Sequence, residues 1–188
     1  MAIRLDLLRR VSDAELMAIS ERNPGYQFER SAKGELLVGA TSTEGGRRSA
    51  QLIHQLMAWN DRSGLGLGFD SSTGWSLPDG SVLSPDASWV ALPRWMTLPS
   101  ADRRGFVHLC PDVVFELRSP SNTVAELRAK MRAYQENGAP LGVLIDPDGR
   151  SVDLYRPGQQ PVRVEGAASV ALDPELPGFT PDLRSIFS

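Results

Sequence analysis

Apolar residues recur along this chain with two kinds of spacing. Positions three and four residues apart mark the buried stripe of a helix, whereas short continuous or alternating apolar runs mark strands. Two runs, Ser12–Glu15 and Thr123–Glu126, also match the capping box, in which a hydroxyl and a carboxylate satisfy backbone N–H groups of the first helical turn. The predicted elements are, in chain order, a helix over 13–22, a hairpin of strands 26–30 and 35–39, a helix over 46–62, strands over 68–77 and 82–91, a proline-rich loop with a helical turn over 93–104, a strand over 112–117, a helix that starts at 123 and ends before Gly138, a strand over 141–145, a hairpin of strands 152–155 and 162–165, and a tail at 183–187.

The segment 112–117, Asp-Val-Val-Phe-Glu-Leu, is nearly all apolar, as expected of a central strand that is covered on both faces. With the helix that follows and the strand at 141–145 it forms a βαβ unit, whose crossover is expected to be right-handed. The order of elements therefore predicts an α/β (α+β) fold, with a mixed β-sheet flanked by helices and with additional β-hairpins.

The composition is that of an ordinary globular protein. The 188 residues are 41% hydrophobic and 23% charged, far from the profile of disordered chains, and a domain of this size buries about 70% of its unfolded surface. Because no repeat and no shift of composition divides the chain, we expect a single domain over 1–188, with an N-terminal helix region 1–25, a core 26–180 and a C-terminal tail 181–188.

Charge and cysteine content limit the partners and the compartment. The net charge of −3 argues against a protein that coats nucleic acid through bulk charge, but it leaves room for a local basic cleft. A single cysteine, Cys110, favours a reducing cytoplasm, and no apolar run is long enough for a membrane segment. Since His54 and His108 are the only histidines, any bound metal must be held by carboxylates.

Glu116 is the first candidate for chemistry, because it is a carboxylate within the apolar central strand. Burying an ionised group without a partner is costly, and a metal ion or a cation is the usual partner. Strand alternation places Glu116 and Arg118 on one face. The structural alternative is therefore a plain ion pair of Glu116 with Arg118 or with a lysine.

Two further carboxylates are candidates to join Glu116. Asp86 follows Pro85, which disturbs a strand where the carboxylate appears, and such bulges often re-aim a side chain. The alternative there is a simple Pro-Asp turn. Glu29 lies in the first predicted hairpin, where the alternative is an exposed strand residue. Each of these signals is weak by itself.

Lys130 lies at the edge of the buried stripe of the helix after the central strand, so its ammonium can reach over the end of the strand that bears Glu116. Basic residues gather near it and in two further pairs: Arg118, Arg128 and Arg132, then Arg47–Arg48 and Arg103–Arg104. Such groups usually form a solvated face. In an acidic chain, however, they are also where a polyanion would have to dock.

A longer pattern runs through the chain and includes these candidates. It consists of Ser84-Pro85-Asp86, the stretch Pro111-Asp-Val-Val-Phe-Glu-Leu-Arg-Ser-Pro-Ser-Asn122, Lys130 followed by Tyr134 and Gly138, and Leu144-Ile145-Asp146-Pro147. On these motifs the chain resembles the Uma-type putative restriction endonucleases, formerly catalogued as a domain of unknown function, in the PD-(D/E)XK nuclease-like superfamily. The resemblance extends from about Tyr26 to Phe179.

The resemblance implies a restriction-endonuclease-like mixed β-sheet flanked by helices, with the active site where two strands diverge. The metal-binding aspartate of the family falls on Asp86, its second acidic residue on Glu116, and its early glutamate on Glu29. The lysine of the superfamily ordinarily lies two residues after the second acid, where this chain has Arg118. In this family it falls on the next helix, at Lys130.

The resemblance also implies a reaction. Asp86 and Glu116 would form an oxygen-ligand site for Mg²⁺ or Mn²⁺, hard cations that keep waters and substrate phosphate oxygens in their coordination shell. Such a site suits phosphodiester hydrolysis, in which the ion activates a water and neutralises charge on the phosphate. Lys130 would orient that water or stabilise the transition state. Glu29 would complete the ligand set or help to position a second ion.

The leading hypothesis is a metal-dependent DNA endonuclease that works as a homodimer, because symmetric dimers are the commonest oligomers and are frequent among nucleases that cut both strands. Its candidate catalytic residues are Asp86, Glu116, Lys130 and Glu29, and its candidate phosphate contacts are Arg118, Arg128 and Arg47. Two alternatives remain open. One is a nuclease-like binding or assembly module without catalysis, whose carboxylates only pair with Lys130 and Arg118. The other is a small-molecule metal hydrolase for which DNA does not compete.

Overall fold

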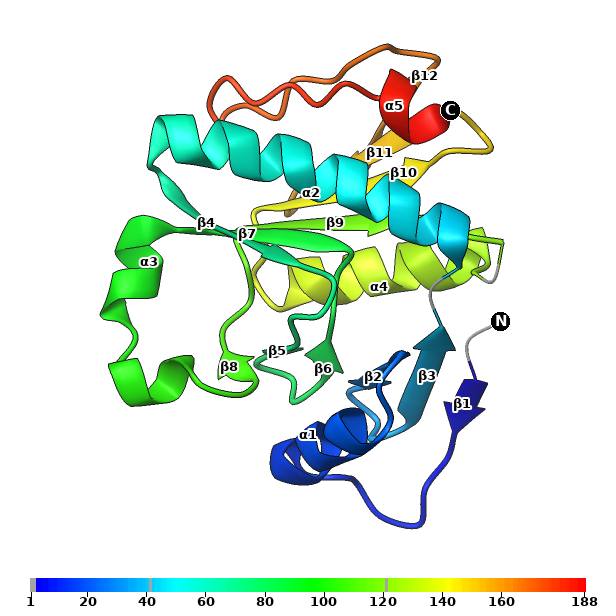
Figure 1. The fold of residues 1–188 in the computed structure, drawn as a ribbon, viewed down its shortest axis with the longest axis vertical. Helices are drawn as coiled ribbons and strands as arrows, with labels where there is room; N and C mark the ends of the chain where they lie inside the picture. Colours follow the sequence, from blue (N-terminus) through cyan, green and yellow to red (C-terminus); the bar gives the residue numbers. More distant parts are fainter. Residues whose placement is uncertain (1–2, 41, 121) are drawn as a thin grey trace.

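The structure of the chain is a computed structural model that describes residues 3–40, 42–120 and 122–188 (Figure 1). Ser121, which belongs to the family pattern, lies outside these ranges. Within them the strands form two six-stranded sheets. The N-terminal sheet has the order β1 (Ile3–Leu5), β3 (Leu36–Ala40), β2 (Tyr26–Arg30), β6 (Val82–Leu83), β5 (Trp75–Ser76) and β8 (Val107–His108). The central sheet has the order β12 (Val162–Glu165), β11 (Ser151–Tyr155), β10 (Leu141–Asp146), β9 (Val113–Leu117), β7 (Ala87–Ala91) and β4 (Gly66–Asp70).

The central sheet is mixed and is covered by a helix on each face, which confirms the predicted fold class. β9 and β10 are parallel and are connected through α4 (Val124–Glu136), while the other neighbouring strands of this sheet are antiparallel. α2 (Thr43–Ser63) crosses the opposite face (Figure 1). The remaining helical segments are α1 (Asp13–Arg22), α3 (Leu92–Thr97), the 3₁₀ turn η1 (Ser100–Arg103) and α5 (Arg184–Phe187).

Alternation along β9 decides what each face of the central sheet packs against. Val113, Phe115 and Leu117 are buried on the face that α2 covers. Val114 lies on the other face, in the cluster with the apolar stripe of α4. Because Glu116 shares this second face with Val114, its carboxylate lies beneath α4 and not at the outer surface of the protein.

The helix starts follow from their capping residues. Both predicted capping boxes, at Ser12 and Thr123, are present. α2 begins before the predicted residue 46, because the hydroxyl of Ser42 caps it by accepting the N–H of Gly45. Glycine is a poor helix former, so the Gly-Gly pair in the first turn conceals this start from the sequence pattern.

The two strands predicted over 68–77 and 82–91 are wrong as continuous elements, since each is divided in two. β4 and β5 separate at a turn in which the Ser72 N–H donates to the Asp70 carboxylate, and β6 and β7 separate at Ser84–Asp86. The halves then join different sheets. Proline cannot donate a ladder hydrogen bond, which explains why the chain leaves one sheet at this point and enters the other.

Other differences concern very short elements. The sequence pattern does not predict β1 or β8, because three and two residues are too few to show a period. The proline-rich loop does contain its helical turn, as α3 and η1, and the predicted tail is the helix α5. No helix among the described residues has the length and apolar content that a bilayer span requires.

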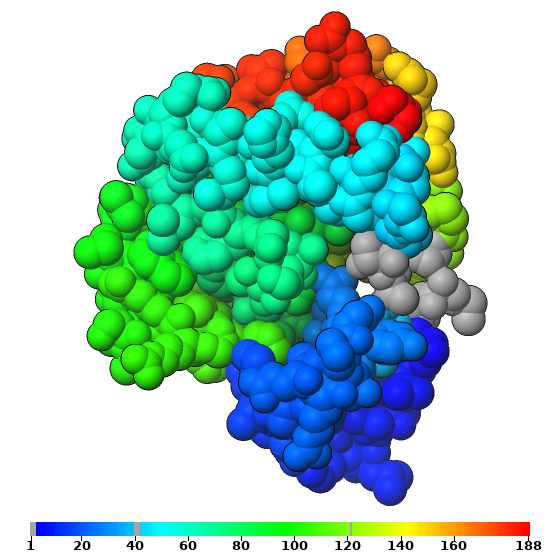
Figure 2. Space-filling view, viewed as in Figure 1, coloured from blue at the N-terminus to red at the C-terminus, as the bar shows by residue number. Residues whose placement is uncertain are grey.

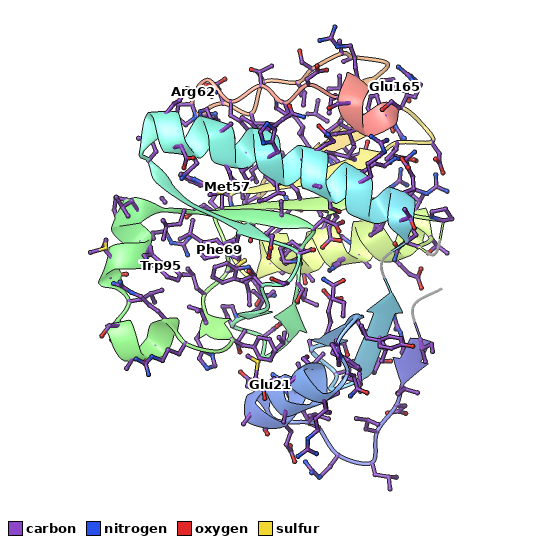
Figure 3. All side chains as sticks on the ribbon, in the orientation of Figure 1. Glu21, Met57, Arg62, Phe69, Trp95 and Glu165 are labelled. Carbon is purple, nitrogen blue, oxygen red and sulfur yellow. The ribbon has the colours of Figure 1, made fainter. Side chains whose placement is uncertain are left out.

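An aromatic cluster connects the two sheets. Phe69 of β4 packs edge-on against Trp75 of β5, with ring centroids 4.9 Å apart, and lies 5.3 Å from Trp95 of α3 (Figure 3). Aromatic pairs in this geometry are worth about 0.5–1.5 kcal/mol beyond the area that they bury. The cluster therefore helps to fix the relative position of the sheets, on which the site between them depends.

Gly66 of β4 approaches β7 so closely that a Cβ atom there would overlap the Val90 carbonyl oxygen and the Trp89 indole. Gly66→Ala is expected to lower the free energy of unfolding by about 1–3 kcal/mol, the usual cost of overpacking. Gly39→Ala in β3 is the matched control, because no described atom lies within 4 Å of the added carbon. Urea denaturation measures both, and equal midpoints would contradict the close approach of β4 and β7.

Candidate active site

The two sheets meet where the chain passes from β6 through Ser84-Pro85-Asp86 into β7. A cleft of about 1080 Å³ opens at this junction, bounded by the N-terminal sheet, the first turns of α2, the end of β9 and one side of α4. In Figure 2 a recess separates the blue N-terminal residues from the cyan α2. The side chains predicted to carry chemistry all line the cleft: Glu29, Asp86, Glu116 and Lys130.

Asp86 is held by backbone and side-chain donors from two elements. Its Oδ2 accepts the N–H of Leu117, at the end of β9, at 2.7 Å. Its Oδ1 accepts the hydroxyl of Ser49, in α2, at 3.4 Å. Burial raises the pKa of Asp86 above its usual range, although the Leu117 N–H acts in the opposite direction. The carboxylate is therefore fixed in position where charge is unfavourable without a cation.

Glu116 is 4% exposed and lies under α4. Its Oε1 is 2.6 Å from Nζ of Lys130, and the same oxygen accepts the hydroxyl of Tyr134 at 3.2 Å. Burial raises the pKa of Glu116 above its ordinary value. The Lys130 ammonium opposes this rise, whereas the negative charges of Asp86 and Glu29 add to it.

Lys130 connects the two sheets through its ammonium group. Besides Glu116, its Nζ contacts Oε1 of Glu29, in β2, at 2.9 Å and donates to the Ser84 carbonyl at 3.3 Å. Burial alone would lower the pKa of Lys130, but the two carboxylates outweigh it and raise the pKa above its ordinary value. Lys130 is therefore a cation, held between the N-terminal sheet and the central strand.

The structure thus brings together all four residues that the sequence selected, from β2, the β6–β7 junction, β9 and α4. Their catalytic roles stay predictions, but their proximity is a property of the fold. Lys130 contacts the carboxylates of Glu29 and Glu116, and Asp86 adds a third negative charge to the cluster, so the one ammonium does not fully compensate it. The sequence analysis did not assign Tyr134 a contact with Glu116, although its place four residues after Lys130 puts both side chains on one helix face.

The donor set of the cluster fits a hard divalent cation. Within the described residues no group of three or more His, Cys, Asp or Glu side chains forms a ready metal cage. Mg²⁺ does not require one, since it is usually bound by one or two carboxylates together with waters and substrate phosphate oxygens. Asp86 and Glu116 are the carboxylates predicted for this role, and the uncompensated charge at the cluster is compatible with a cation there.

Arg118 lines the cleft but does not pair with Glu116. Its Nη1 lies 2.9 Å from Oδ2 of Asp146, at the end of β10. Two ion pairs were considered for Glu116. The prediction of a pair with Arg118 is therefore wrong, whereas the pair with a lysine is present, at Lys130.

Arg47 and Arg128, the other predicted phosphate contacts, do not line the cleft. Arg47 donates to Glu44, at 2.7 Å for the shortest of these bonds, and to the carbonyl groups of Ser185 and Ser188 near the C-terminus. Arg128 faces Asp153 of β11, 4.0 Å away. Their spacing in sequence suggested proximity to the site, but each projects from its helix in another direction. Arg48, which the sequence grouped only with Arg47, does line the cleft.

Comparisons with known proteins agree with this arrangement. A family model described as "Uma2: Putative restriction endonuclease" matches residues 13–185. The chain is similar in structure to a crystal structure described as a putative nuclease belonging to DUF820 from Anabaena variabilis ATCC 29413. The TM-score is 0.74, the sequence identity is 17%, and the match covers 94% of this chain and 97% of the other. No curated protein matches the chain.

Lys130→Met would leave the carboxylates of Glu29 and Glu116 without their shared cation. In EDTA we expect it to lower the free energy of unfolding by about 3 kcal/mol, because removing one partner of a buried ion pair strands the other. The only other lysine, the exposed Lys33, provides the control Lys33→Met, with the same change of side chain. Chemical denaturation compares the two, and equal stabilities would show that the ion pair contributes nothing to the fold.

Proposed function

The chain belongs to the Uma2 family of putative restriction endonucleases, and we propose that it is a metal-dependent DNA endonuclease with its reaction centre at Asp86, Glu116 and Lys130. The observation that carries the proposal is the place of Glu116. It is a buried carboxylate on a central strand, 2.6 Å from the Lys130 ammonium, and it lines an open cleft. Burying a charged group costs free energy. A role for Glu116 in a centre that acts on a phosphodiester would explain why the protein keeps a charge at this position.

Asp86 and Glu116 are the residues that would hold the cation. When bound, Mg²⁺ or Mn²⁺ supplies an activated water and neutralises charge on the scissile phosphate. Tyr134 donates to the same Glu116 oxygen that Lys130 contacts, which fixes the orientation of this carboxylate. The Leu117 N–H does the same for Asp86.

Lys130 acts as a positive hydrogen-bond donor and not as a base. Its two carboxylate partners raise its pKa against the effect of burial, so it keeps its proton. A fixed ammonium in a partly enclosed site stabilises the negative charge that develops on the phosphate as the bond breaks. Glu29 holds that ammonium in place, 2.9 Å away, and this is the role that its geometry supports best.

The alternative with support in the geometry is a nuclease-like module without catalysis. In that case the contacts of Lys130 with Glu29 and Glu116 are only a structural ion-pair network. The two hypotheses differ in what the carboxylates bind. In the endonuclease they bind a divalent ion, whereas in the non-catalytic module their only partners are side chains of the protein.

Nicking of supercoiled plasmid at low salt with Mg²⁺ or Mn²⁺ tests the proposal. Asp86→Ala and Glu116→Ala are each expected to lower the rate at least about 10³-fold, because each removes a metal-binding carboxylate. Lys130→Ala is expected to lower it about 10²–10³-fold, through loss of charge stabilisation. Lys33→Ala should leave the rate unchanged, since its side chain is exposed and outside the cleft.

Circular dichroism of each variant separates loss of activity from loss of fold. Unchanged nicking by a folded double variant Asp86→Ala/Glu116→Ala would sink the proposal. If the wild-type protein neither nicks DNA nor binds Mn²⁺ in calorimetry, the non-catalytic module is the better description. Metal-dependent hydrolysis that excess DNA does not inhibit would point instead to a small-molecule hydrolase.

A homodimer belongs to the same proposal, because cleavage of both strands of a duplex is simplest with two centres related by symmetry. β1 is the edge strand of the N-terminal sheet and its Ile3 and Leu5 side chains are exposed, so a second chain can pair with this strand. Light scattering of the purified protein is expected to give twice the chain mass of 20.5 kDa. A mass of a single chain at micromolar concentration would contradict this expectation.

A further inference from the structure

Two arginines that line the cleft, Arg48 and Arg118, are chain neighbours of groups that bond to Asp86. Arg48 precedes Ser49, whose hydroxyl donates to Asp86 Oδ1. Arg118 follows Leu117, whose N–H donates to Asp86 Oδ2. α2 and the end of β9 supply these two arginines, and both side chains line the cleft.

A single turn holds both guanidinium groups. Nη1 of Arg118 lies 2.9 Å from Asp146, and Nη1 of Arg48 lies 3.9 Å from Asp148. Only Pro147 separates these two acids, in the turn between β10 and β11. The two arginines are therefore anchored at the same rim, with their acidic partners on the side of the β10–β11 turn.

Both arginines have donor capacity that the protein does not use. Within the described part of the chain, the buried Nε atoms of Arg48 and Arg118 have no hydrogen-bond acceptor. Nε of Arg48 is 3.0 Å from Glu44 Oε1, an ion-pair contact without hydrogen-bond geometry. In contrast, the neighbouring Arg47 donates through its Nε to Glu44. Buried donors without acceptors cost roughly 1–3 kcal/mol each, so an incoming acceptor that reorients these groups is favoured.

We propose that Arg48 and Arg118 form a phosphate-binding subsite that takes the backbone phosphate next to the one that is cleaved. This inference rests on the proposed function. The guanidinium fork matches phosphate oxygens in pairs. Although Glu44, Asp146 and Asp148 lie near the two guanidinium groups, each arginine keeps an Nε donor without an acceptor, and a phosphate oxygen can accept from it. The scissile group belongs at Asp86, Glu116 and Lys130, so the arginine pair holds the strand on the far side of Asp86.

Binding of a short fluorescein-labelled DNA oligonucleotide in EDTA, followed by anisotropy, tests the subsite without any cleavage. The double variant Arg48→Gln/Arg118→Gln is expected to bind at least about tenfold more weakly, since hydrogen bonds to charged groups are the strong ones. The slope of log K against log salt should become shallower by about 0.7–0.9, the value of one phosphate contact. Both the single strand and its duplex are titrated.

The matched control is Arg47→Gln/Arg128→Gln, which removes the same charge from α2 and α4 at positions outside the cleft. It should bind as the parent does. A third protein, Arg48→Lys/Arg118→Lys, keeps both positive charges but loses the forked guanidinium groups. Its salt slope should equal that of the parent protein, and its affinity should lie between those of the parent and the double Gln variant. Thermal unfolding checks that each variant is folded.

Equal weakening in the control, or no measurable binding by the parent protein, would overturn the subsite. The outcome is independent of the nicking assay. If binding depends on the two arginines but the protein does not nick DNA, the subsite is retained and the endonuclease proposal is rejected. If the protein nicks DNA but binding does not depend on the arginines, the endonuclease proposal is retained and the subsite is rejected.

Discussion

The contacts of Lys130 hold the site together. Its ammonium reaches Glu116 on the central strand, Glu29 in the N-terminal sheet and the Ser84 carbonyl at the junction of the two sheets. One cation thus joins three segments that are far apart in sequence, and it lies where a carboxylate would otherwise be buried alone. Lys130 positions Glu29 and, together with Tyr134, the carboxylate of Glu116.

A buried charged network of this kind is weak evidence for stability, because well-packed apolar residues can often replace such networks at no cost. What the network provides is a fixed arrangement of charge at the edge of an open cleft. Burial and the neighbouring negative charges raise the pKa values of Asp86 and Glu116. The cluster therefore lacks part of the positive charge that would stabilise its ionised carboxylates. Perturbed carboxylates in a cleft are typical of functional sites, and a divalent cation is the partner that their chemistry favours.

The sequence was sufficient for β9, α4 and β10, and it selected the four residues that the structure brings together at the cleft. The run 112–117 is apolar except at Asp112 and Glu116, so both the strand and its anomaly are visible without a structure. The sequence shows Pro85 interrupting the strand at Ser84–Asp86, but not that the two halves join different sheets, because their pairing partners are distant in sequence. The same limit applies to Arg47 and Arg48, which are adjacent in sequence. Only the rotation of α2 decides which of the two faces the cleft.

The most direct measurement is anomalous diffraction from crystals of the protein soaked in Mn²⁺, collected at the manganese edge. A peak in contact with the carboxylates of both Asp86 and Glu116, absent from crystals of Asp86→Ala, is the result that a metal-dependent centre predicts. Crystals with no manganese at these two side chains, and with the Lys130 contacts to Glu29 and Glu116 unchanged, would contradict it.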